Sequence, residues 1–241
     1  MTKNGVRSMN YQNQMKLKRF FRKPVVTYTF LGLQLILFLL MTIDGGSTNT
    51  FTLIGYGAKF NPLLVAGEWW RLVTPIFLHI GWVHLIMNSV ILYYLGIQLE
   101  DTLGHWRFAA IYLLSGILGN AASFAFNAFS VSAGASTSLF GLFGATLFLG
   151  KTYTGNPAIQ HMARNFGTLI LINLVFGFFN TSVDLAGHIG GLAGGYLIST
   201  AISIPDPLPR WKKKRVLYGA GFAVLLILLL SIGYFRTLGA F

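Results

Sequence analysis

The feature that most constrains the fold of this 241-residue chain is a series of seven apolar stretches joined by short polar segments. A helix needs about 20 residues to cross a hydrocarbon core of roughly 30 Å. The fourth and fifth stretches are shorter, which suits helices that are surrounded by other helices rather than by lipid. We therefore predict an all-α polytopic membrane protein. The predicted helices lie near residues 25–43, 82–99, 108–126, 136–150, 166–180, 185–204 and 216–235.

The composition agrees with a membrane protein and excludes several functions. Hydrophobic residues make up 54% of the chain and charged residues 10%, a balance that a soluble domain cannot expose to water. A net charge of +12 would suggest nucleic acid as a partner of a soluble protein, but here the basic residues flank the apolar stretches, so we predict no nucleic-acid binding. No cysteine and no His-Glu-x-x-His motif is present, so we predict no metal and no cofactor.

The distribution of Lys and Arg predicts the orientation in the membrane. Fifteen of the 18 basic residues fall on the side that includes the N-terminus, and only Lys59, Arg71 and Arg236 fall on the other. Because cytoplasmic loops are enriched in Lys and Arg, we expect a cytoplasmic N-terminus and a C-terminus outside. The first stretch follows a basic run but is too long for the core of a signal peptide, so we interpret it as a retained helix.

Three regions follow from this pattern: a basic cytoplasmic tail at 1–24, a six-helix core at 25–204, and a basic cytoplasmic linker with a seventh helix at 205–241. The core contains one long connection, 44–81, which is rich in aromatic residues and poor in charge. Such aromatics favour a membrane interface. We expect an irregular or short-helical, partly embedded element on the outer face.

Four polar residues from three stretches lie in the same leaflet under this topology: Ser136, His188, His84 and Asn88. Polar side chains inside a membrane are costly and usually face the protein interior. A neutral histidine can serve as the general base that a serine nucleophile needs. His84 and Asn88 are four residues apart on one helix face and could stabilise an oxyanion, although two residues bonded to backbone carbonyls would show the same spacing.

Small residues surround the candidate serine and histidine. Glycines recur every four residues on two adjoining faces of the sixth stretch, and Gly141 and Ala145 give the fourth stretch a matching face. Such faces allow close helix packing, which alone would explain the glycines, but a histidine within the pattern favours a site. The glycines of the two faces are Gly187, Gly191 and Gly195, and Gly190 and Gly194.

The polar run 130–138 predicts a loop that enters a helix N-terminus, where free N–H groups could hold an oxyanion. Simple N-capping by Ser136 or Ser138 is the alternative. Asp184 precedes His188 by four residues, but we expect it to cap the sixth helix rather than to complete a triad.

Trp70-Arg71, His84-x-x-x-Asn88, Gly134-x-Ser136 and the small residues beside His188 resemble, in order and spacing, the motifs of the rhomboid family of intramembrane serine proteases. The resemblance covers about residues 25–204. It implies a six-helix bundle, to which the last stretch adds a C-terminal seventh helix, in a bacterial cell membrane. It also implies that Ser136 is the nucleophile, that His188 is its base, and that the backbone at Ser136 with His84 and Asn88 forms the oxyanion hole.

The resemblance assigns supporting roles as well. It implies that Gly134 shapes the turn before the nucleophile and that Phe140 packs beside His188, whereas Trp70 and Arg71 have a structural part in the outer connection and Gly191 lies near the site. The chain departs from the family pattern at Thr137, where glycine is usual, and at Gly187, where alanine is usual. Because Ser136-Thr137-Ser138 is typical of a helix start, we expect helical backbone at Thr137, where threonine is acceptable.

The predicted function is cleavage of transmembrane or juxtamembrane segments of other membrane proteins, within the lipid bilayer, through an acyl-enzyme. A catalytically inactive relative that binds transmembrane helices is the alternative. A transporter is disfavoured because the polar residues lie towards one face instead of the midplane.

Overall fold

The computed structural model describes residues 23–179, 183–202 and 209–240. Nearly all of the predicted tail at 1–24 lies outside these residues, as do residues 203–208 at the predicted boundary between core and linker. The regular structure of the described residues is helical, and an isolated antiparallel bridge joins Lys59 to Ser132. The prediction of an all-α polytopic fold is confirmed.

Each predicted stretch corresponds to one long helix in the described part of the chain. Six of these helices are long and apolar enough to cross a membrane, and α7, with 17 residues, falls just short of that length. The long helices are α2 (Val25–Ile43), α5 (Gly81–Leu103), α6 (His105–Phe126), α7 (Ser136–Thr152), α8 (Pro157–Phe179), α9 (Leu185–Ile202) and α10 (Pro209–Leu238).

The prediction that the fifth helix is short is wrong, whereas the fourth is short as predicted. α8 has 23 residues because it begins at Pro157, nine residues before the predicted start. The side chain of Asn156 accepts hydrogen bonds from the backbone N–H groups of Ala158 (3.0 Å) and Ile159 (3.2 Å), and proline suits the first helical position. Polar residues in the first turns of α8 lower its hydropathy and concealed this start.

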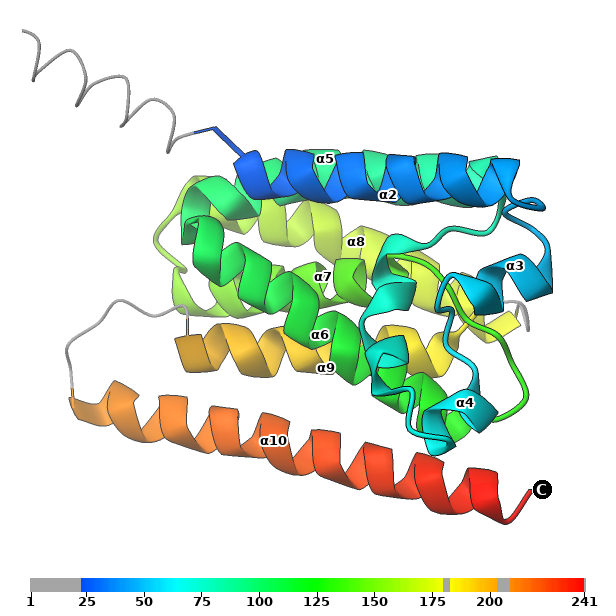
Figure 1. The fold of residues 1–241 in the computed structure, drawn as a ribbon. Helices are drawn as coiled ribbons and strands as arrows, with labels where there is room; N and C mark the ends of the chain where they lie inside the picture. Colours follow the sequence, from blue (N-terminus) through cyan, green and yellow to red (C-terminus); the bar gives the residue numbers. More distant parts are fainter. Residues whose placement is uncertain (1–22, 180–182, 203–208, 241) are drawn as a thin grey trace, which may run out of the picture.

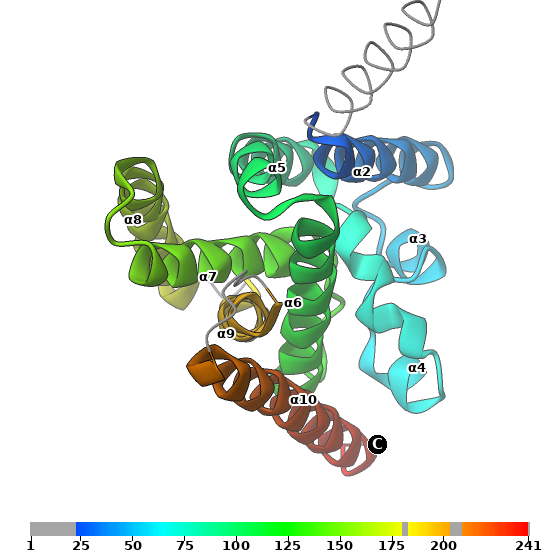
Figure 2. The same cartoon turned by 90° about the vertical axis from the view of Figure 1, so that its left-hand side faces the viewer.

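The short helix α7 is mostly buried, whereas α8 is mostly exposed on the outside of the bundle. Figures 1 and 2 show α9 at the centre, packed against α6, α7 and α10, with α2 and α5 paired on another side. The shorter elements of the connection between α2 and α5 gather at one end of the bundle (Figure 1).

The two glycine faces of α9 pack against two different helices. A Cβ atom on Gly191 would collide with the backbone of Thr137 in α7, and one on Gly195 would collide with the backbone of Gly141. On the adjoining face, a Cβ atom on Gly190 would lie 2.5 Å from Ala122 of α6. The predicted close approach of α7 and α9 through small residues is confirmed, and it allows side chains at their N-terminal ends to meet.

The pair α2 and α5 is held by a buried carboxylate. Glu100, which the predicted helix at 82–99 left outside, lies within α5 and accepts from the backbone N–H groups of Val26 (2.9 Å) and Thr27 (2.8 Å) and from the Thr27 hydroxyl (2.6 Å). A carboxylate at a helix N-terminus satisfies free N–H groups and complements the helix dipole.

The connection between α2 and α5 is short-helical, as predicted. It contains α3 (Thr50–Gly55), α4 (Asn61–Val65) and two 3-10 turns, η1 (Trp69–Leu72) and η2 (Thr74–Phe77). Arg71 is buried and holds these pieces together, since its guanidinium pairs with Glu68 (2.6 Å) and donates to the carbonyl groups of Ile54 (2.7 Å) and Ala58 (2.9 Å). Trp70, in contrast, is 55% exposed.

Candidate active site

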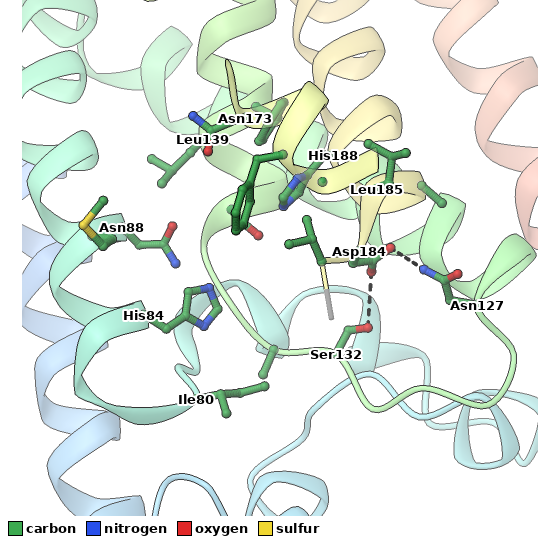
Figure 3. A pocket seen from close by; sticks show the side chains of 18 of the residues that line it. Ile80, His84, Asn88, Asn127, Ser132, Leu139, Asn173, Asp184, Leu185 and His188 are labelled. Carbon is green, nitrogen blue, oxygen red and sulfur yellow. Dashed lines mark hydrogen bonds between the residues drawn. The ribbon is translucent and has the colours of Figure 1, made fainter. Parts of the chain in front are cut away.

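A cavity of about 770 Å³ lies between α5 and α8, and the N-terminal ends of α7 and α9 also line it. Ser136, His188, His84 and Asn88 all line it. Figure 3 shows His84 and Asn88 on the α5 side of the cavity and His188 across from them. The structure therefore brings the four candidate residues, which come from three distant parts of the sequence, to one pocket.

Ser136 is the first residue of α7, and Gly134 prepares its position. Gly134 has a φ of 150°, a conformation that side chains with a Cβ atom rarely adopt. A Cβ atom there would also lie 2.5 Å from Cε1 of His84 and 3.6 Å from the hydroxyl of Ser136. Glycine is needed at 134 for both reasons, so that the loop can pass between His84 and the candidate nucleophile.

The N–H of Gly134 donates to the carbonyl of Pro75 at 2.9 Å. Gly134 therefore contributes to the site through its shape, because its own N–H is already bonded. Ser136 does not serve as the N-cap of α7, since that position belongs to Ala135, which has no side-chain cap. The first N–H groups of α7 have no carbonyl partner one turn earlier within the helix, as at any helix N-terminus.

His188 lies in the first turn of α9 and is buried. Its ring stacks on Phe140 of α7 with 4.2 Å between centroids and 12° between planes. Within the described residues, Nδ1 of His188 has no hydrogen-bond partner. The ring is thus oriented by aromatic stacking and by the helix that carries it, and no carboxylate is bonded to Nδ1.

His84 and Asn88 project from the same face of α5. Asn88 is 5% exposed, and its amide nitrogen Nδ2 has no hydrogen-bond partner among the described residues. A buried donor without a partner is costly unless something else accepts from it. Because Asn88 lines the pocket, that acceptor can belong to a bound molecule.

Asp184 caps α9, as predicted, and also organises the loop before α7. Its carboxylate accepts from the backbone N–H of Gly187 (2.9 Å), the amide of Asn127 (2.5 Å) and the hydroxyl of Ser132 (3.2 Å). The two side-chain bonds are drawn in Figure 3. Through these three bonds the carboxylate joins the start of α9 to the loop that leads to Ser136.

Thr137 has helical backbone, as predicted, because it lies in the first turn of α7 and no described residue other than glycine has a positive φ. Its side chain is 4% exposed and packs against Gly119 of α6. Its hydroxyl has no hydrogen-bond partner in the described structure. Threonine in place of glycine therefore fits without backbone strain.

Two buried residues that contact the loop or a side chain of the pocket could not be found from sequence spacing. Lys59 is fully buried, and its ammonium donates to Asn61 and to the 127–130 part of the loop. Burial lowers the pKa of Lys59 to about 8, and the nearby charge of Asp184 acts in the opposite direction. His79 is also buried, and its ring meets that of His84 edge to face at 5.3 Å. Their only sequence signal is that a charged or polar residue lies in an otherwise apolar connection.

A helical membrane protein with a serine and a histidine in one internal pocket has the features of an intramembrane serine protease. The chain belongs to the rhomboid family of such proteases, since a sequence model of the rhomboid domain matches residues 66–205. The family predicted from the motifs is confirmed. Since six helices of the described part are long and apolar enough to span a bilayer, the chain is an integral membrane protein.

Individual relatives agree with this assignment. The chain is 46% identical over 183 residues to the rhomboid protease GluP of Bacillus subtilis, a match that covers 76% of this chain and 36% of GluP. It is 35% identical over 197 residues to YdcA, a second rhomboid-type protein of that organism, covering 80% of this chain and 94% of YdcA. Rhomboid-like protease 3 of Toxoplasma gondii is 31% identical over 205 residues, covering 82% and 77%.

Proposed function

We propose that this chain is an active endopeptidase that cleaves transmembrane or juxtamembrane segments of other membrane proteins through a Ser136–His188 dyad. The observation that carries the proposal is the shared pocket of Ser136, His188, His84 and Asn88. The pocket is lined by Met87 and Ile91 of α5 and by Phe176 of α8, apolar side chains that suit a segment arriving from lipid.

In this mechanism, the hydroxyl oxygen of Ser136 attacks the scissile carbonyl carbon while His188 takes the hydroxyl proton. The C–N bond then breaks as His188 returns the proton to the leaving amine. Water then attacks the acyl carbon while His188 takes its proton, and the ester bond breaks as His188 returns the proton to the oxygen of Ser136. A dyad is favoured over a triad because Nδ1 of His188 has no described hydrogen-bond partner and Asp184 is bonded elsewhere.

The oxyanion of the tetrahedral intermediate would be stabilised by Asn88, whose Nδ2 is a buried donor without a partner, together with His84 and the N–H groups that begin α7. Donors that are fixed in place before the reaction cost no reorganisation when charge develops. Because Gly134 has no side chain, the loop can pass close to His84 and place Ser136 in this pocket.

The test is covalent labelling by a fluorescent serine-directed phosphonate, combined with cleavage of a panel of single-pass membrane proteins. Ser136→Ala and His188→Ala should abolish both signals, whereas Ser138→Ala, which changes a serine two residues further along the same helix, should keep them. Asp184→Asn should keep turnover within about tenfold, or ~1.4 kcal/mol.

If the wild-type chain is inert to the phosphonate but still binds transmembrane segments, it is an inactive relative instead. Loss of nearly all turnover in folded Asp184→Asn would replace the dyad with a triad. The orientation in the membrane, the bacterial location and the membrane-protein partners predicted above belong to the same proposal.

A further inference from the structure

The buried lysine Lys59 joins the connection between α2 and α5 to the loop formed by residues 127–134, which is one wall of the pocket. Its ammonium has three N–H donors, and they reach the side-chain oxygen of Asn61 (3.1 Å), the carbonyl of Asn127 (2.8 Å) and the hydroxyl of Ser130 (3.5 Å). Its backbone pairs with that of Ser132 through bonds of 2.9 and 3.0 Å. Lys59 thus holds this loop at three points.

Asp184 holds the same loop from the other side, through Asn127 and Ser132. The loop therefore lies between a buried cation and a carboxylate. Residues 130–133 of this loop line the pocket, and the chain then runs directly through Gly134 to Ser136. A change in the position of Lys59 would move the surface that a substrate touches more than it would move α7 or α9, which are fixed by their own glycine contacts.

The C-terminal helix α10 reaches Lys59 through Asn61. An ammonium can only donate, so the oxygen of the Asn61 amide must face Lys59 and its nitrogen must point away. That nitrogen donates to the hydroxyl of Thr237 in α10 (3.0 Å) and to the carbonyl of Phe124 at the end of α6 (2.9 Å). Asn61 and Thr237 are both buried.

Other contacts fix the same end of α10. Arg236 donates to the carbonyl of Ala125 (3.1 Å), and the ring of Phe124 lies so close to Gly233 that a Cβ atom there would collide with it. Figures 1 and 2 show the C-terminal end of α10 beside α4, the helix that begins with Asn61. The end of α10 is therefore a fixed support and not a loosely attached segment.

We propose that α10 positions the pocket wall for substrate binding through the chain of hydrogen bonds from Thr237 to Asn61 to Lys59 to the 127–134 loop. Lys59, Asn61 and Thr237 are positioning residues, since none of them lines the pocket. Breaking this chain of bonds should lower the affinity for the transmembrane substrate without changing the chemistry at Ser136. This consequence rests on the proposed function. It gives the seventh helix a role in substrate binding.

The experiment replaces Thr237 with Val, which keeps the shape of the side chain and removes the hydroxyl. The matched control is Thr200→Val in α9, where the buried hydroxyl donates to the carbonyl of Tyr196 in its own helix. For a cleaved single-pass substrate, Thr237→Val should raise KM about five- to tenfold, because a buried donor loses its acceptor, and should leave kcat within about twofold. Thr237→Ser should restore KM, and Thr200→Val should not change it.

Labelling of Ser136 by a small phosphonate should proceed within about twofold of the wild-type rate in Thr237→Val, because a small reagent makes few contacts with the 127–134 loop. Lys59→Met should raise KM at least as much, and the double variant Lys59→Met/Thr237→Val should be no worse than Lys59→Met alone. Additive effects would overturn the proposed chain of bonds. An equal loss of labelling and cleavage in Thr237→Val, or a Thr237→Val that behaves like Thr200→Val, would also overturn it.

A binding measurement separates this inference from the proposed function. In the Ser136→Ala background, a fluorescent peptide carrying the transmembrane segment of a bacterial single-pass protein should bind with a Kd about five- to tenfold higher when Thr237→Val is added. An unchanged Kd would refute the role of α10. Because this arm requires no catalysis, it remains decisive if the wild-type chain proves inert to phosphonates, a result that would refute only the proposed activity.

Discussion

Thr137 stands beside the candidate nucleophile in helical conformation, and its side chain fills space against Gly119 of α6. Replacing it with glycine removes this contact and lowers helix propensity, so Thr137→Gly should reduce the free energy of unfolding by about 1–2 kcal/mol. Phosphonate labelling should change by no more than about tenfold, since the backbone at 137 already has the geometry that presents Ser136.

Thermal unfolding in detergent and the rate of labelling check the two parts of this prediction. The exposed Thr154→Gly serves as a control that should affect neither quantity by a comparable amount. A Thr137→Gly chain that gains far more than tenfold in labelling would mean that threonine suppresses activity, and the inactive-relative interpretation would then be preferred.

We expect His79 to make the free energy of unfolding depend on pH. Burial lowers the pKa of His79 from 6.5 to about 3, and the neighbouring His84 acts in the same direction. The unfolded chain therefore takes up a proton at a higher pH than the folded chain. The free energy of unfolding should fall as the pH decreases from 6.5 towards 3, by up to about 1.4 kcal/mol per pH unit from this group.

Unfolding of His79→Gln, followed in detergent between pH 4 and 8, should show a smaller loss of stability on the acid side than the wild-type chain. His161→Gln replaces an exposed histidine of α8 and should keep the wild-type slope. Identical slopes for the wild-type chain and His79→Gln would show that His79 has no part in acid sensitivity.

The close packing of α7 and α9, which carry Ser136 and His188, depends on glycine at their contact. A Cβ atom on Gly191 would collide with the backbone of Thr137, so Gly191→Ala must move the two helices apart. We expect a loss of about 1–3 kcal/mol in stability and at least a tenfold loss in cleavage, because general-base catalysis needs hydrogen-bond reach.

Gly32→Ala is the matched control for Gly191→Ala. Gly32 is also a glycine within a helix, but nothing lies within 4 Å of a Cβ atom added there. Since alanine favours helices more than glycine does, Gly32→Ala should be neutral or slightly stabilising. Thermal unfolding and substrate cleavage measured on both variants decide the point, and equal behaviour of the two would contradict a packing role for the α7–α9 contact.

The sequence allowed the long helices to be predicted because hydropathy and glycine spacing are local signals. It even placed the starts of α2, α7 and α9 at the observed residues. It failed where a helix begins with polar residues, as in α8, whose start is indicated only by Asn156-Pro157. The capping role of Asp184 was local and predictable, but its bonds to Asn127 and Ser132 join segments more than 50 residues apart and could not be read from spacing.

Among the described residues, one group of polar contacts of long sequence range lies at the end of the helix bundle that carries the site. Lys59, Asn61 and Thr237 meet there, close to the loop before Ser136, although α10 is last in the chain. The candidate dyad was predictable because its residues stand in motifs. The contacts among Lys59, Asn61 and Thr237 were not predictable, because nothing in the sequence marks these single polar residues as partners. The side of the membrane on which this end of the bundle lies decides on which side substrates would be cut.

The orientation prediction places that end outside and the loop between α7 and α8 in the cytoplasm, because 15 of 18 basic residues fall on the other side. The chain has no cysteine, so single introduced cysteines report without background. Thr48 and Thr154 form a matched pair, since both are exposed threonines in turns at opposite ends of the bundle.

In intact cells that produce the protein, Thr48→Cys should react with a membrane-impermeant maleimide, whereas Thr154→Cys should react only after the cells are opened. The physical reason is the cost of moving clusters of Lys and Arg across the membrane during insertion, which fixes the basic side in the cytoplasm. Both variants should be labelled equally in detergent, which verifies that each thiol is accessible. The reverse pattern in intact cells would invert the topology and place the Ser136 pocket near the cytoplasmic face, so that substrates would be cut on that side.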